Sequence, residues 1–204
     1  MTEPTLTISG VTAPGLEGVR DAFEANFREM DELGAGFAVI HRGELVASLT
    51  GGWADRQKTH PWEANTLVPV YSTTKGISAL VLAALIDQLP GGYETPVADV
   101  WPEFAANGKG AVTLAEVLSH QAGLPGFASE IDPDLWLDPL ACAAAIAALA
   151  PMWPPGTQHG YHPLTWGYIA GEIAYRLSGK TLGTVLREMF PDVDFRIGLP
   201  ASDH

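Results

Sequence analysis

The sequence predicts an α+β protein, in which an antiparallel β-sheet flanked by helices is followed by a mostly helical domain. Apolar residues recur every three or four positions over 16–33, which indicates an amphipathic helix. Two β-type runs follow at 37–40 and 45–49, and Gly43 between them permits the tight reversal of a hairpin. Residues 76–89 are apolar on nearly every side, which predicts a helix buried in a core.

The second half of the chain contains the signals of several short helices. Thr113 and Glu116 have the spacing of a capping box. Asp138 and Pro139 suit the N-cap and first position of an alanine-rich helix, and Gly179 suits the residue after another helix. The predicted domains are therefore residues 1–89, which include the sheet, and residues 90–204, which are mostly helical.

Composition excludes several classes of partner. The 204 residues are 47% hydrophobic, which is enough for a sizeable core, and the net charge of −13 would repel the phosphates of a nucleic acid. The sequence contains no run of about 18 apolar residues, which a membrane-spanning helix needs. The N-terminus lacks the basic start and apolar core of a secretory signal, so we expect a soluble, cytoplasmic protein.

The strongest chemical signal is the segment 71–76, Tyr-Ser-Thr-Thr-Lys-Gly, at the start of the buried helix. Ser72 and Lys75 are three residues apart, so they share one face of the first turn. A helix N-terminus favours a developing alkoxide and disfavours a protonated lysine. A serine hydroxyl needs such help, because it is inert until a nearby base takes its proton. We predict Ser72 as a nucleophile; an N-capping serine with a solvated lysine is the structural alternative.

Further stretches of the sequence accompany this motif in a fixed order. With them, the chain resembles the Ser-x-x-Lys hydrolases, a penicillin-binding-protein-like family that includes class C β-lactamases, D-stereospecific peptidases and family VIII carboxylesterases. The resemblance spans most of the chain, is greatest to the esterases, and implies a β-lactamase/transpeptidase-like fold. The stretches that support it are 51–56, 67–70, 101–104, 117–125, 155–157 and 197–200.

A tyrosine after the Pro-Gly-Thr turn is the family's second catalytic motif, and Tyr161 occupies that position. The resemblance implies that Tyr161 is the general base beside Lys75, although the residue types alone leave open which of the two accepts the proton. The family motif is usually Tyr-x-Asn, whereas Pro163 stands at the third position here. This departure favours ester hydrolysis over efficient turnover of β-lactams.

The family's third motif, a Lys-Thr-Gly or similar segment on a strand that faces the serine, is missing from the sequence. The resemblance implies that this strand also supplies one N–H group of the oxyanion hole. We therefore expect a hydrolase that is incomplete at the C-terminus and lacks C-terminal sheet strands. A complementary C-terminal chain or a second copy of the protein is expected to cover the exposed sheet edges.

Aromatic and imidazole side chains near these motifs are candidates for the substrate pocket. We expect His120 to pack or hydrogen-bond beneath the site rather than to bind a metal. No metal ion or other cofactor is expected, because His159 and His162 lack a carboxylate or cysteine at ligand spacing. The predicted substrate-binding residues are Tyr71, Trp153, His159, His162 and Trp166.

The leading functional hypothesis is acyl transfer from a small ester to Ser72, with Lys75 and Tyr161 moving the proton and water releasing the acyl group. A β-lactamase, an amide hydrolase or a transesterase would use the same mechanism. The alternative from another functional class is a catalytically inactive fragment or binding module that needs a second chain.

Overall fold

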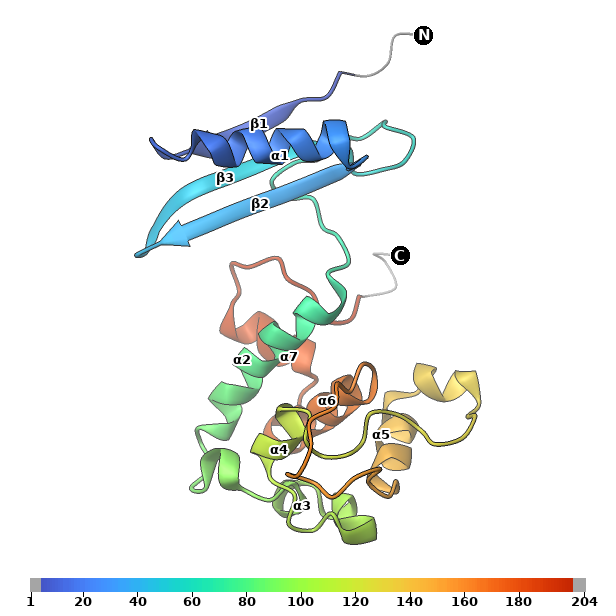
Figure 1. Ribbon diagram of the computed structural model, residues 1–204. Helices are drawn as coiled ribbons and strands as arrows, with labels where there is room; N and C mark the ends of the chain where they lie inside the picture. Colours follow the sequence, from blue (N-terminus) through green and yellow to red (C-terminus); the bar gives the residue numbers. More distant parts are fainter. Residues whose placement is uncertain (1–4, 200–204) are drawn as a thin grey trace. The chain divides into compact units, whose positions relative to one another are not determined.

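The structure is a computed structural model that describes residues 5–199, in two compact units that divide after residue 69 (Figure 1). The sequence places the boundary after residue 89, whereas the chain passes from the first unit to the second after Pro69. The difference lies in helix α2 (Thr74–Ile86), which packs against helices α6 and α7 of the second unit. Residues 1–4, used above to exclude a secretory signal, and Pro200 of the 197–200 stretch lie outside the described residues.

The first unit contains a three-stranded antiparallel sheet in the order β1-β3-β2. Strands β2 (Gly34–His41) and β3 (Glu44–Gly52) form the predicted hairpin. Its two turn residues, Arg42 and Gly43, have φ angles of 52° and 84°, and two positive φ angles characterise the type I′ turn that suits the twist of a hairpin. Strand β1 (Ile8–Thr12) was not expected from the sequence.

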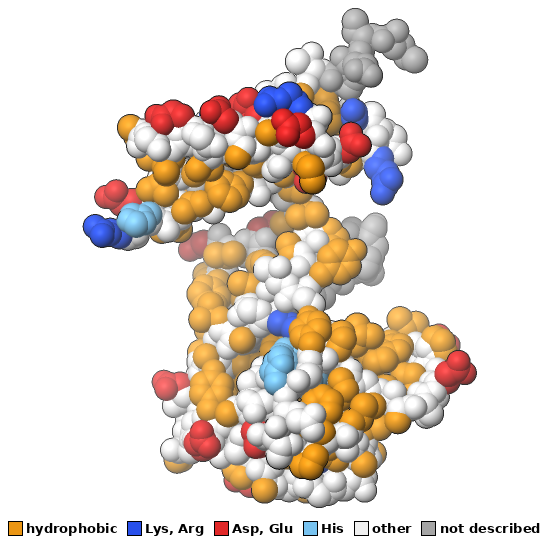
Figure 2. Space-filling view, in the orientation of Figure 1, with side chains coloured by type: hydrophobic (Ala, Val, Ile, Leu, Met, Phe, Trp, Pro, Cys, Tyr) orange, Lys and Arg blue, Asp and Glu red, His pale blue; other side chains and the backbone are white. Residues whose placement is uncertain are grey.

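Helix α1 (Glu17–Glu29) packs against β1 and β3, and it ends before the predicted limit at residue 33. Glycine allows the close approach of the helix to the sheet. A Cβ atom at Gly51 would lie 3.3 Å from the rings of Phe23 and Phe27 and 2.4 Å from the Ile8 side chain. The solvent face of α1 has charged side chains, among them Asp21 and Glu29, and acidic side chains gather there in Figure 2.

The second unit is helical, and its core is one cluster of buried side chains around α2, α5 and α6. From α2 the core receives Val81, Leu82 and Ile86, whereas Leu80 is 51% exposed, so this helix is buried on one side and not on all sides as predicted. Among residues 5–199 no helix combines the length and apolar character needed to cross a membrane. The remaining helices are α3 (Val97–Val100), α4 (Leu114–Leu118), α5 (Pro139–Ala147), α6 (Thr165–Ser178) and α7 (Leu182–Met189). The 3₁₀ turns are η1 (Tyr71–Thr73), η2 (Gly92–Glu94), η3 (Pro102–Gly108) and η4 (Pro133–Leu137).

Three predicted helix ends are confirmed. Thr113 and Glu116 form both hydrogen bonds of the capping box at the start of α4. The Asp138 side chain accepts hydrogen bonds from the N–H groups of Leu140 and Ala141 at the start of α5. Gly179 ends α6 with a φ of 71°, in the left-handed region that favours glycine.

The cap at Asp138 gives a stability prediction. Asp138→Ala removes the acceptor for two N–H groups of α5, so we expect the free energy of unfolding to fall by about 1 kcal/mol. Urea denaturation measures this change. Asp192→Ala, at an exposed position outside the helices and strands, is the matched control, and an equal loss in both variants would contradict a capping role.

Candidate active site

Ser72 lies in the 3₁₀ turn η1, one turn before the regular part of α2. The turn is closed by the Thr73 N–H group, which donates to the Val70 carbonyl at 3.1 Å. Tyr71 has a φ of 46°, a conformation that non-glycine residues adopt rarely and that concentrates at functional sites. The chain therefore makes a tight and unusual turn at the residue before the predicted nucleophile.

The three residues predicted to act together do meet in the structure. The Tyr161 hydroxyl lies 2.5 Å from the Ser72 hydroxyl oxygen, and the Lys75 ammonium lies 3.2 Å from the same oxygen. Ser72 and Tyr161 are 89 positions apart in the sequence, so only the tertiary fold brings them together. The Lys75 ammonium also donates to the backbone carbonyl of Pro163 at 2.8 Å. Pro163, which has no side-chain amide, thus provides the lysine with a main-chain acceptor.

The electrostatics of this group favour proton transfer. The pKa of Tyr161 is lowered, first by its hydrogen bond with Ser72, then by its hydrogen bond with Lys75, and also by the positive charge of Lys75, whereas burial opposes the shift. The Lys75 nitrogen is 5.0 Å from the centre of the Tyr161 ring. A phenol beside a cation loses its proton more easily, so Tyr161 is suited to accept the proton of Ser72.

Trp153 supports the loop that leads to Tyr161. Its indole N–H donates to the Gln158 carbonyl at 3.2 Å, and its ring packs on Gly160, where a Cβ atom would lie 2.6 Å from the indole. The side chain is half-buried. Trp153 therefore shapes the loop, and its predicted contact with substrate stays a prediction.

Two of the predicted pocket residues are corrected by their burial. His162 is 1% exposed, because its Nε2 accepts from the Leu124 N–H at 2.9 Å and its Nδ1 lies 2.5 Å from the Gly160 carbonyl oxygen. Trp166 is 3% exposed and donates to the Leu118 carbonyl at 3.2 Å. Both side chains lie under the site, so they support its residues instead of lining an open pocket.

Two other predicted pocket residues are exposed. The Tyr71 side chain is 86% accessible, and His159 is also exposed, with its ring 5.9 Å from that of His120. On the face shown in Figure 2, basic, histidine and hydrophobic side chains meet at the surface of the second unit. Tyr71 and His159 can reach a bound molecule, and their roles in substrate binding stay predictions.

His120 lies beneath Tyr161, as expected from the sequence. Its ring centre is 4.9 Å from that of Tyr161, and its Nδ1 accepts a hydrogen bond from the His162 N–H at 3.1 Å. The pKa of His120 is lowered to about 4, first by burial and then by repulsion from His162, His159 and Lys75. Burial is also the main cause of the lowered pKa of His162. Both imidazoles are therefore neutral at pH 7.

These histidines predict a pH dependence of stability. A histidine in the unfolded chain has a pKa near 6.5, so the unfolded state binds more protons than the folded state between about pH 6.5 and pH 4. The free energy of unfolding should therefore fall as the pH is lowered through this window, by on the order of 2 kcal/mol. Urea denaturation at pH 7 and pH 4.5 measures it. An undiminished pH dependence in His120→Asn would contradict the assignment to His120.

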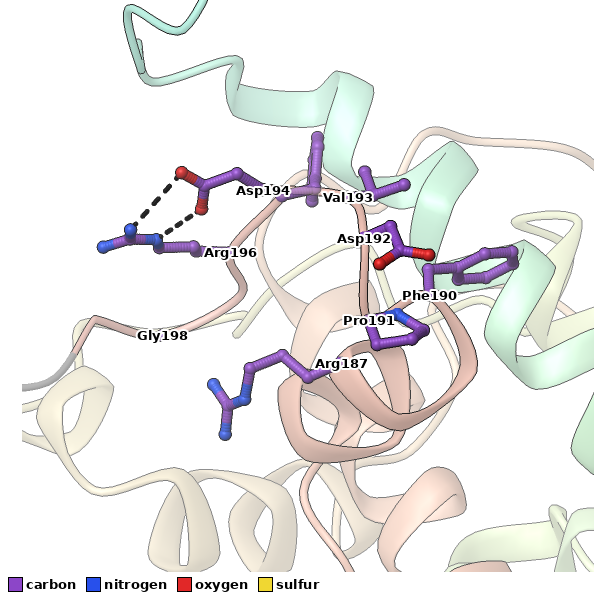
Figure 3. Close-up of a pocket in the computed structure, with 9 residues that line it drawn as sticks. Arg187, Phe190, Pro191, Asp192, Val193, Asp194, Arg196 and Gly198 are labelled. Atoms are coloured by element: carbon purple, nitrogen blue, oxygen red, sulfur yellow. Dashed lines mark hydrogen bonds and ion pairs between the residues drawn. The ribbon is translucent and has the colours of Figure 1, made fainter.

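Among the described residues, no group of three or more histidine, cysteine, aspartate or glutamate side chains is arranged to hold a metal ion. A hollow of about 540 Å³, which was not predicted from the sequence, lies between the end of α7 and the segment 190–198. Figure 3 shows residues that line it. It is lined by Arg187 and by the ion pair of Asp194 and Arg196, at 2.8 Å. The predicted site residues, all within 5–199, are not among the side chains that line it.

Comparison with known proteins identifies the family of this chain. The family model described as Beta-lactamase matches residues 23–193. The chain belongs to the beta-lactamase family. Its β-lactamase/transpeptidase-like fold is shared with a solved penicillin-binding protein homologue from Caulobacter crescentus, at 49% identity and a TM-score of 0.90, over 97% of this chain and 54% of that one.

Two other beta-lactamase relatives have esterase names. A family VIII carboxylesterase structure is 44% identical with a TM-score of 0.86, over 97% of this chain and 55% of that one. The Esterase/beta-lactamase LipL of Mycobacterium tuberculosis is 36% identical over 200 residues, which are 96% of this chain and 46% of LipL. The chain thus spans about half the length of these relatives.

Proposed function

We propose that this chain carries the nucleophile and proton-transfer groups of a serine hydrolase of the carboxylesterase type, which acts on small esters in the cytoplasm through an acyl-enzyme. The observation that supports this most strongly is the convergence of the Tyr161 hydroxyl and the Lys75 ammonium on the Ser72 hydroxyl, at 2.5 and 3.2 Å. Both distances are within the reach that proton transfer requires.

In the first half of the proposed reaction, the Tyr161 oxygen accepts the Ser72 proton while the serine oxygen attacks the ester carbonyl carbon. The resulting tetrahedral intermediate collapses when the bond to the alcohol oxygen breaks and Tyr161 returns its proton to that oxygen. Before it accepts the proton and after it returns it, Tyr161 is a phenolate, and the Lys75 ammonium stabilises this form because it lies 5.0 Å from the ring centre. The products are the free alcohol and an acyl group bound to Ser72.

In the second half, Tyr161 accepts a proton from water, and the water oxygen attacks the acyl carbon. The bond to the Ser72 oxygen then breaks, and the proton returns from Tyr161 to that oxygen. The carboxylic acid leaves, and the site recovers its original protonation. Since each step uses one phenol and one lysine, the proposed reaction needs no cofactor.

Esters are the proposed substrates for two reasons. Position 163, next but one to Tyr161, presents a proline, so no side-chain amide is available there to bind the amide group of a β-lactam or peptide. The name of the family VIII carboxylesterase points the same way, whereas the name of LipL includes both esterase and beta-lactamase. A D-aminopeptidase from Cereibacter sphaeroides is 27% identical to this chain over 166 residues. Because of this relative, amide hydrolysis by the same mechanism is the alternative activity.

The choice between these substrates is tested with nitrophenyl esters of short and long acyl chains and with the β-lactam nitrocefin. We expect hydrolysis of the esters, with a kcat/KM at least about tenfold higher than that for nitrocefin; tenfold corresponds to about 1.4 kcal/mol in transition-state binding. Faster hydrolysis of nitrocefin would replace the esterase proposal by that of a β-lactamase.

A fluorophosphonate probe tests the proposal against a non-catalytic fragment or binding module. The Ser72 oxygen attacks phosphorus and fluoride leaves, so the protein gains the mass of the phosphonyl group. We expect this increment on the peptide that contains Ser72. A folded sample that gains no mass would favour the binding module and a requirement for a second chain.

A further inference from the structure

One residue holds both neighbours of Tyr161. The backbone carbonyl of His120 accepts the N–H of Gly160 at 3.1 Å, and the Nδ1 atom of its ring accepts the N–H of His162, also at 3.1 Å. The N–H groups of the two residues that flank Tyr161 are thus both held by His120, which lies on a distant segment of the chain. Because the backbone on both sides is fixed, the direction in which the Tyr161 side chain leaves the loop is fixed as well.

The ring of His120 also supports the phenol itself. The two ring centres are 4.9 Å apart, at an interplanar angle of 58°, a separation and tilt common for interacting aromatic rings. Tyr161 is 47% exposed, so little else restrains its free side, and its hydroxyl must still stay within 2.5 Å of the Ser72 oxygen. A displacement of about 1 Å in such a group can reduce a rate about a hundredfold.

The protonation of both imidazoles fits this role. A ring nitrogen that accepts a backbone N–H must be unprotonated, and His120 accepts one at Nδ1 while His162 accepts one at Nε2, from Leu124. His162 then has its proton on Nδ1, directed at the Gly160 carbonyl, and this bond braces the same loop. The groups that face His120 are His159, His162, Tyr161 and Lys75, and repulsion from His162, His159 and Lys75 opposes a charge on His120.

We propose that His120 is a positioning residue that holds Tyr161 in register with Ser72 through its Nδ1 atom and its backbone carbonyl. The inference rests on the proposed role of Tyr161 as the base. His120 does not touch the reacting atoms; it acts through the geometry of residues 160–162. Its own backbone has a φ of 65°, in the left-handed region, and its carbonyl and its ring both contact the same loop.

Two substitutions separate positioning from simple packing. His120→Asn keeps a side-chain acceptor near the place of Nδ1 and is tolerated in the left-handed region, and His120→Gly also tolerates that backbone but removes the acceptor. His41→Phe, at an exposed histidine of β2, is the control. Circular dichroism and thermal unfolding establish that each variant is folded.

The decisive measurement is the ultraviolet titration of tyrosine ionisation, with Tyr161→Phe subtracted so that only Tyr161 is observed. In the natural chain and in His120→Asn, Tyr161 should titrate below the ordinary tyrosine pKa, because it stays beside Lys75. In folded His120→Gly, the titration should return towards the ordinary value, and the rate of Ser72 labelling by fluorophosphonate should fall at least about tenfold. His41→Phe should behave as the natural chain.

The outcomes distinguish this inference from the proposed function. A low Tyr161 titration that persists in folded His120→Gly, with unchanged Ser72 labelling, would overturn positioning by His120 and leave the hydrolase proposal intact. A low titration that is lost in His120→Gly and kept in His120→Asn supports positioning even where no ester is hydrolysed, because this readout does not depend on turnover. Should His120→Gly fail to fold, loss of the low titration in folded His120→Asn would contradict the role of the acceptor.

Discussion

Ser72→Ala should abolish fluorophosphonate labelling and lower ester hydrolysis by on the order of 10⁴-fold or more, because it removes the only atom that forms the acyl bond in the proposed reaction. Ser72 is exposed, and its hydroxyl makes no backbone hydrogen bond in the structure among the described residues, so the fold should be unaffected. Mass spectrometry of the labelled protein and initial rates with a nitrophenyl ester measure the two effects.

Ser9→Ala is the matched control for this substitution, since Ser9 is an exposed serine of β1. It should keep both labelling and hydrolysis. Comparable hydrolysis by Ser72→Ala and the natural chain would show that the activity arises elsewhere in the sample or at another residue, and the nucleophile assignment would then be abandoned.

Tyr161→Phe should have the second largest effect, a fall in kcat of about 10²- to 10⁴-fold, the usual contribution of a general base. The substitution keeps the ring that packs on His120 and deletes only the oxygen that contacts Ser72. The base is active when deprotonated, so kcat/KM of the natural chain should rise with pH through the lowered pKa of Tyr161. This limb of the pH profile should disappear in the variant.

Tyr175→Phe is the control for this change, because Tyr175 is 49% exposed, close to the 47% of Tyr161, and lies on the surface of α6. It should leave the rate and the pH profile as they are. A Tyr161→Phe variant that keeps both the rate and the rising limb would assign the base to Lys75 instead.

Much of the fold was predictable because its signals are local. The hairpin turn at Gly43, the capping box at Thr113 and the N-cap at Asp138 each depend on residues within four positions of one another, and all three are confirmed. Strand β1 is different. Its central Ser9 and Gly10 have weak β-propensity, and the strand exists because it pairs with β3, a contact across about 40 positions.

The positions of the site residues were predictable where a motif sets their spacing. They were not predictable where the burial of a side chain determines whether it lines an open pocket. The motif placed Ser72 and Lys75 on one turn, and the resemblance placed Tyr161 beside them. The burial of His162 and Trp166 depends on segment 118–124, which covers them and accepts or donates their hydrogen bonds. The division of the chain into compact units after residue 69 was not predictable for the same reason, since α2 belongs to the unit against which it packs, and composition does not report that contact.

The acceptor that holds the Lys75 ammonium belongs to the main chain of Pro163 and not to a side chain. A point mutation exchanges side chains and leaves every peptide oxygen in the protein, so no single replacement at 163 deletes this acceptor while the loop keeps its course. The amine is thereby anchored independently of which residue occupies the position. The exposed side chain at 163 can then be exchanged without removing the acceptor that holds the lysine.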